Sequence, residues 1–78
     1  APQDLEFLKI ACSLLPEGPL TLSTWSDWTA AIANATGRKG KQLYMPIRLA
    51  LTGLVHGPEM GSLLPLMSRE IVLYRLSV

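Results

Sequence analysis

The sequence predicts an all-α fold, a compact bundle or cage of about five short helices. Three observations predict it: apolar residues recur at helical steps of three and four, polar–apolar alternation is never sustained, and Gly and Pro divide the chain into short segments. Seventy-eight residues suffice for one hydrophobic core only, so residues 1–78 are expected to form a single domain. With 49% hydrophobic and 17% charged residues, the composition is that of a folded globule.

The first helix is expected to run through the N-terminal residues and to end at Pro16 and Gly18. Its predicted apolar stripe consists of Leu5, Leu8, Cys12 and Leu15. After the connector at 16–22, Ser23 or Thr24 is expected to cap a second helix, with Gly37 as its C-terminal residue. The predicted buried stripe of this helix consists of Trp25, Trp28, Ile32 and Ala35, with Trp25 the more exposed tryptophan.

The third helix is expected at about residues 41–52, ended by Gly53. Its predicted apolar face consists of Leu43, Ile47, Ala50, Leu51 and Leu54. Because proline lacks a backbone N–H, Pro46 predicts either a helix that starts near Tyr44 or a bend there.

The Gly-Pro pair in residues 54–61 predicts a loop or tight turn. A fourth helix is expected from about Pro58 to Met67, with Pro65 disturbing its last turn. Ser68 is expected to cap a fifth helix, with Met67 packing on Val72 as a hydrophobic staple. The predicted inward-facing residues of the last helix are Val72, Leu73 and Leu76.

Metal and catalytic chemistry are excluded by the residue inventory. Cys12 and His56 are each the only residue of their type, so neither a zinc site nor a catalytic triad is supported. Cys12 is expected in the core and His56 in a loop. A single cysteine cannot form an internal disulfide, which suits a reducing compartment, and no apolar segment is long enough to span a membrane. We therefore expect a cytoplasmic location.

The beginning of the chain favours a piece of a longer protein. The sequence starts at Ala1 and not at a methionine, and this indicates processing or excision. Asp4, Glu6 and Lys9 interrupt the apolar residues before a signal-peptide core could form.

Residues 36–53 contain four of the seven Lys and Arg residues. Arg38, Lys39 and Lys41 lie in a turn with two glycines, which is typical of a solvated surface but also suits a close approach to phosphate. One helical face carries Tyr44 and Arg48, followed by Thr52. This face is either solvated or able to grip a nucleobase by stacking and hydrogen bonding, and periodicity does not decide between the two. The net charge of +1 means that any nucleic-acid role rests on local geometry.

Two stretches, TGRKGKQLYMPIRLALTG at 36–53 and HGPEMGSLLPLMSREIVLYRL at 56–76, resemble the C-terminal end of bacterial glutamyl-tRNA synthetases. That family shares a glycine-lysine turn, an MP-x-R helix and an HGPE loop in this order. The resemblance implies the last subdomain of an all-α anticodon-binding region, in an enzyme that attaches glutamate to its tRNA using ATP and Mg²⁺. The chain has no HIGH-like or KMSKS-like motif, so the catalytic domain is absent from it and no cofactor is expected in it.

The resemblance also implies site residues. The arginine of the MP-x-R helix is Arg48, which is expected to face outward to the anticodon, and the following loop contributes Gly57, Pro58, Glu59 and Met60. Pro58 and Met60 are expected to offer apolar surface to a base. Tyr44 adds a stacking surface, and Lys39 and Lys41 are expected to hold phosphates without reading sequence. Ser68 departs from the family's usual glycine but can cap the last helix.

These observations predict a tRNA anticodon-binding module that has no catalytic activity itself and belongs to a monomeric synthetase. The partners are then the anticodon loop of tRNA and the rest of the synthetase. A small helical module that docks a protein partner is the alternative, since the hydrophobic content and near-neutral charge leave room for an exposed apolar patch.

Overall fold

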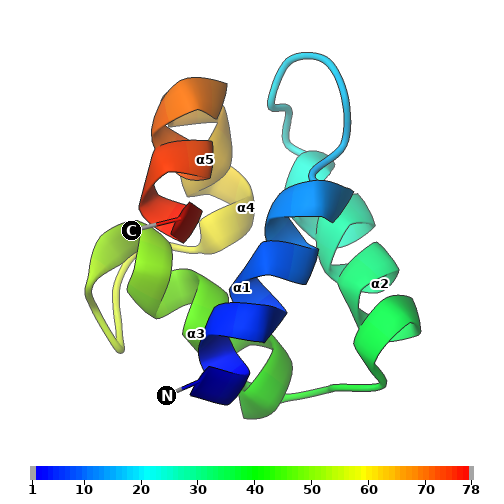
Figure 1. Cartoon of the computed structure of the whole chain (residues 1–78). Helices are drawn as coiled ribbons and strands as arrows, with labels where there is room; N and C mark the ends of the chain where they lie inside the picture. The colour runs from blue at the N-terminus through cyan, green and yellow to red at the C-terminus, as the bar shows by residue number, and fades with distance from the viewer. Residues whose placement is uncertain (1, 78) are drawn as a thin grey trace.

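The computed structural model describes residues 2–77, which form five α-helices and one 3₁₀ helix and contain no strand (Figure 1). The elements, in chain order, are α1 (Pro2–Leu14), α2 (Thr24–Thr36), α3 (Lys41–Thr52), α4 (Met60–Leu63), η1 (Leu64–Leu66) and α5 (Arg69–Ser77). The predicted all-α fold of about five short helices is confirmed. None of the helices in this range is long and apolar enough to cross a membrane.

Helix α1 lies at the centre of the arrangement and contacts α2, α3 and α5 (Figure 1). The core contains side chains from each of the helices, and its largest fully buried members are Trp28, Ile32, Ile47, Leu51, Leu64 and Val72. The indole Nε1 of Trp28 donates a hydrogen bond of 2.8 Å to the carbonyl of Ala11, which ties α2 to the end of α1. Trp28 therefore both fills the core and satisfies a buried backbone carbonyl.

The predicted stripe of α1 was wrong at its first residue, since Leu5 is 58% exposed. Leu15 is buried as predicted, and Leu8 and Cys12 are partly buried against the core. Phe7 and Ala11, which were not predicted in the stripe, are also buried. The buried arc is rotated around the helix because α1 packs against three helices and not against one. The apolar spacing identified the helix but not the side that its partners cover.

Helix α2 buries Trp28 and Ile32 as predicted and leaves Trp25 half-buried. Ala35 is exposed, so its predicted place in the stripe was wrong. By helical spacing Ala35 lies on the same side as Trp28, but it stands in the last turn, where that side is no longer covered. Gly37 ends the helix in the left-handed conformation, as expected.

Helix α3 spans Lys41–Thr52, which confirms the predicted range. It continues through Pro46, so of the two alternatives for this proline a start near Tyr44 was wrong, and a bend there stays a prediction. Leu43, Ile47 and Leu51 are buried as predicted, but Leu54 lies beyond the C-terminal Gly53 and is exposed. Gly53 stops the helix before Leu54 can continue its apolar face.

The fourth helix is shorter than predicted. It begins at Met60 because the residue before it, Glu59, is extended (φ −61°, ψ 129°). It passes at Leu64 into a 3₁₀ turn that contains Pro65, which has no N–H for an α-helical bond. Ser68 accepts a hydrogen bond of 3.1 Å at Oγ from the N–H of Ile71, which confirms the predicted cap of α5. The staple between Met67 and Val72 stays a prediction.

Candidate nucleic-acid interface

A hollow of about 370 Å³ lies where α2, α3 and the start of α4 meet. We call it the aromatic hollow, and its lining residues are Trp25, Ser26, Thr29, Tyr44, Met45, Arg48, Glu59 and Met60. It contains four of the residues predicted for RNA binding: Tyr44 and Arg48 on α3, Glu59 at the end of the 53–59 loop, and Met60 at the start of α4. Two of the three residues of the polar face predicted for α3, Tyr44 and Arg48, therefore line a concave surface.

Two aromatic rings stand at one side of the aromatic hollow. The ring centroids of Trp25 and Tyr44 are 6.0 Å apart, with the ring planes tilted by 38°. Trp28 meets Trp25 edge-on at 6.0 Å from the core side, which holds the Trp25 ring in place. Tyr44 is 44% exposed. Half-exposed rings of this kind offer a planar, sequence-tolerant surface on which a base can stack.

Arg48 connects α3 to the loop that follows it. Its Nη2 donates a hydrogen bond of 2.5 Å to the carbonyl of Pro58. Its Nη1 is buried and has no hydrogen-bond partner among the described residues. Arg48 is half-buried and so does not face freely outward, which corrects that expectation. An acceptor that reaches Nη1 satisfies a buried donor, whose unpaired state costs about 1–3 kcal/mol.

Gly57 makes the approach of this loop to Arg48 possible. A Cβ at position 57 would lie 3.1 Å from Arg48 Nη1, so a side chain there requires the guanidinium to shift by a few tenths of an ångström. Pro58 and Glu59 are exposed next to it. Met60 lines the hollow but is only 3% exposed. The expectation that it offers a large apolar surface to a base was therefore wrong. Met60 is the first residue of α4, and its side chain is part of the hydrophobic core.

Lys39 and Lys41, two of the residues predicted for RNA binding, are exposed. Lys41 starts α3 and shares a face with Tyr44 and Arg48 by helical spacing. Gly40 before it has φ 63° and ψ −142°, a backbone conformation open to glycine alone, which sets the sharp entry to the helix.

The remaining arginines donate to backbone carbonyls. Arg38 bonds Gln42, Arg75 bonds Leu51, and Arg69 bonds Pro16, Gly18 and Leu15. Among the four cations of residues 36–53, the exposed ones are therefore Lys39 and Lys41. His56 lies exposed in the loop, as predicted.

Trp25 lines the hollow although it is not among the residues predicted for RNA binding. Its helical spacing to Trp28 and Ile32 favours core packing over base stacking. The signal in the sequence was its place at the start of the apolar stripe, where it is expected to be the more exposed tryptophan. Its ring is in fact shared between the core and the hollow. Ser26, Thr29 and Met45 also line the hollow and carry no signal of this kind.

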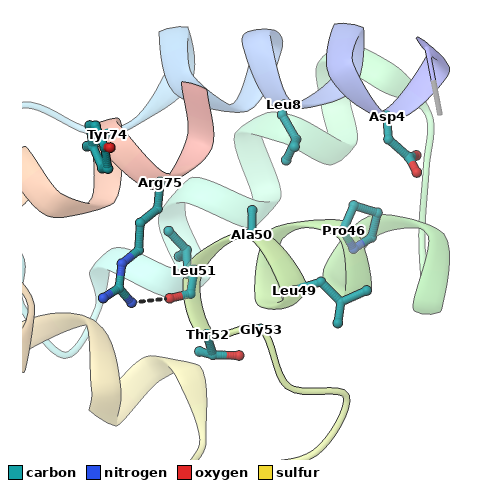
Figure 2. A pocket seen from close by; sticks show the side chains of 10 residues that line it. All are labelled: Asp4, Leu8, Pro46, Leu49, Ala50, Leu51, Thr52, Gly53, Tyr74 and Arg75. Carbon is teal, nitrogen blue, oxygen red and sulfur yellow. Dashed lines mark hydrogen bonds between the residues drawn. The ribbon is translucent and has the colours of Figure 1, made fainter. Parts of the chain in front are cut away.

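A second and larger hollow, of about 660 Å³, lies between α1, α3 and α5 (Figure 2). We call it the apolar hollow; Leu8, Pro46, Leu49, Ala50 and Tyr74 provide much of its surface. Figure 2 shows Asp4 and Arg75 at opposite ends of the apolar hollow. Arg75 Nη1 donates a hydrogen bond of 2.5 Å to the carbonyl of Leu51. None of the residues predicted for RNA binding lines it. Within residues 2–77, no group of three or more His, Cys, Asp or Glu side chains is placed to hold a metal ion.

Comparison with known proteins identifies the family of this chain. The family described as anticodon binding domain matches residues 1–78. Glutamate–tRNA ligase 2 of Hyphomonas neptunium is 58% identical over 77 residues, which cover 99% of this chain and 17% of that protein. Glutamate–tRNA ligase 1 of Rickettsia typhi is 58% identical over 73 residues, covering 94% of this chain and 16% of that protein.

Glutamate–tRNA ligase 1 of Rhodospirillum rubrum is 54% identical over 76 residues, which cover 97% of this chain and 17% of that protein. The chain thus spans about 17% of the length of the relatives that it matches. No solved structure matches it. From the family match over its whole length, the chain belongs to the anticodon binding domain family.

Proposed function

We propose that this chain is the tRNA anticodon-binding module of a glutamate–tRNA ligase. The family match and the names of the relatives support this proposal. The observation that carries it is the aromatic hollow, where two half-exposed rings stand beside a buried guanidinium N–H that has no partner among the described residues. Stacking surfaces and fixed donors are what the reading of unstacked RNA bases requires.

In this proposal an anticodon base leaves the stack and lies against Tyr44 and Trp25. Arg48 donates to an oxygen or ring nitrogen of that base once the Gly57 turn, which lies against Nη1 in the free protein, moves away from it. Backbone groups at Gly57 and the carboxylate of Glu59 lie at the rim, where they can meet the base edge. Lys39 and Lys41 hold the neighbouring phosphates and add affinity without sequence preference.

The activity itself belongs to the longer protein. The proposed ligase joins glutamate to its tRNA with ATP and Mg²⁺, and this chain supplies recognition only, with no cofactor of its own. We place the ligase in the cytoplasm as a monomer. Because two exposed lysines release few counterions, the isolated chain binds RNA weakly and the rest of the ligase contributes most of the affinity.

The test is the replacement of Arg48 by alanine in the full-length ligase. Losing a charged donor costs about 1.5–3 kcal/mol, so the KM for tRNA rises by about 10- to 150-fold while the KM values for glutamate and ATP change little. Arg75→Ala is the matched control, since Arg75 also donates to a backbone carbonyl at 2.5 Å but lies away from the aromatic hollow. Unchanged tRNA kinetics in Arg48→Ala, or an equal effect of both variants, contradicts the proposal.

The apolar hollow favours a second candidate function, the docking of a protein partner. Leu49 and Tyr74 are exposed large apolar side chains at its edge, and such patches on small domains mark interaction surfaces. This function does not involve Tyr44 or Arg48, so the two candidates use different faces of the molecule. Mapping which face responds to an RNA anticodon stem-loop separates them.

A further inference from the structure

We propose that Arg38 is a positioning residue, which fixes the first turn of α3 relative to the rest of that helix and does not itself bind RNA. As far as RNA is concerned, this inference rests on the proposed function. Arg38 stands in the basic turn next to Lys39, so a charge count treats the two alike. The structure separates them, because Lys39 is exposed whereas Arg38 is half-buried and engaged on several sides.

The first step in the argument is the hydrogen bond that Pro46 cannot make. In an α-helix the N–H of residue 46 bonds the carbonyl of residue 42, and proline has no N–H. The carbonyl of Gln42 is therefore left without its helical partner inside α3. Arg38 Nη1 donates to this carbonyl at 3.1 Å. A side chain from the turn before the helix thus supplies the donor that the helix lacks.

The second step is the anchoring of the Arg38 side chain from outside α3. Its guanidinium carbon lies 4.0 Å from the centre of the Phe7 ring, a cation–π geometry, and Nη1 is 3.7 Å from Asp4 Oδ1. Its backbone N–H donates to Thr36 Oγ1 at 3.2 Å, which fixes the turn itself. Arg38 therefore links α1 to the first turn of α3, and the Gln42 carbonyl is where that link reaches the helix.

The third step is the position of the recognition residues. Lys41 and Tyr44 precede Pro46, whereas Arg48 follows it. The helix is weakest at the missing bond, so a movement of its first turn there changes the distance between Tyr44 and Arg48 across the aromatic hollow. By holding the Gln42 carbonyl, Arg38 keeps the Tyr44 ring at 6.0 Å from Trp25. Its contribution to binding is then geometric and carries no phosphate contact.

The experiment compares Arg38→Met and Lys39→Met in binding to an anticodon stem-loop over a range of salt concentrations. Loss of one net hydrogen bond worth about 0.5–1.5 kcal/mol predicts that Arg38→Met binds about 2- to 10-fold more weakly. The slope of log K against log[salt] stays at the wild-type value. Lys39→Met, the matched control, lowers that slope by about 0.7, the value for one phosphate contact on a single strand. A similar fall of the slope in Arg38→Met makes Arg38 a phosphate ligand and overturns the inference.

Pro46→Ala provides the rescue. The alanine that replaces Pro46 has an N–H that bonds the Gln42 carbonyl directly, so the donor of Arg38 becomes redundant there. In the Pro46→Ala background, Arg38→Met therefore weakens binding by less than about 2-fold, a difference that a double-mutant cycle measures. An equal loss in both backgrounds shows that Arg38 does not act through Gln42 and contradicts the proposal.

The same double-mutant cycle is also measured in the protein without RNA. A failure of the proposed function can then be distinguished from a failure of the positioning role. The equilibrium constant of unfolding, from urea titration, gives the coupling between positions 38 and 46 in the free protein. The chemical shift of the Trp25 indole N–H reports the approach of Tyr44, and we expect a change in Arg38→Met that Pro46→Ala reverses. If wild-type protein binds no stem-loop but this coupling is present, the proposed function fails and the positioning stands. If the coupling is absent, the positioning fails whatever the RNA result.

Discussion

Replacing Tyr44 by leucine removes one aromatic wall of the aromatic hollow and leaves an apolar side chain in its place. Tyr44 is 44% exposed and its ring centroid is 6.0 Å from that of Trp25, so the leucine keeps packing against α2 but offers no flat ring. Aromatic stacking is worth about 1–3 kcal/mol per base. Because Trp25 still provides the second wall, we expect the lower part of this range, or about 5- to 10-fold weaker binding of an anticodon stem-loop.

Tyr74→Leu is the matched control for this substitution. Tyr74 is 68% exposed and lines the apolar hollow, away from the residues proposed to meet RNA. We expect its replacement to leave RNA affinity within about 2-fold of wild type. The assay is the dissociation constant from fluorescence anisotropy of a labelled stem-loop at constant salt, with folding of each variant checked by circular dichroism. If the two variants lose the same affinity, or if Tyr44→Leu loses none, the stacking role of the aromatic hollow is refuted.

Two further predictions concern the core and the charge of the domain. Trp28→Phe removes the indole that donates to the Ala11 carbonyl and leaves that buried acceptor unpaired. We therefore expect the free energy of unfolding to fall by about 2 kcal/mol or more, as measured by urea titration. A loss below about 0.5 kcal/mol contradicts the assigned hydrogen bond. Replacing Lys39 and Lys41 together by methionine lowers the salt slope of RNA binding by about 1.4. An unchanged slope means that phosphates lie elsewhere.

Local signals were sufficient to predict most of the helix boundaries. Gly37 and Gly53 end α2 and α3 where expected, and Ser68 caps α5, because these residues act on the backbone next to them. The buried side of α1 was different, since Leu5 has the right spacing but is exposed. Which arc of a helix is buried depends on its tertiary partners, and those are not encoded in the periodicity of a single segment.

The path of α3 through Pro46 also depends on contacts outside the helix. Proline inside a helix costs about 3 kcal/mol or more, which is why either a late start or a bend is expected at this point of the helix. The structure shows a continuous helix in which Arg38 bonds the freed Gln42 carbonyl while it lies over Phe7. The partner on α1 is distant in sequence, so no local rule for proline could have included it.

The candidate site was predicted by residue type more successfully than by exposure. Tyr44, Arg48 and Glu59 do meet at one hollow, although their roles in RNA binding stay predictions. Met60 is buried, and Arg48 is tied to Pro58 and not free. A resemblance identifies which positions matter, whereas the burial of each follows from how the 53–59 loop folds back on α3.

The most direct test of the proposed recognition surface is a titration of the ¹⁵N-labelled protein with an anticodon stem-loop, followed by amide chemical shifts. We predict that shifts concentrate at the aromatic hollow, in residues 44–60 and at the Trp25 indole N–H, and that the residues of the apolar hollow on α1 and α5 stay in place. Shifts centred on Leu8 and Tyr74 contradict the account and favour the docking of a protein partner.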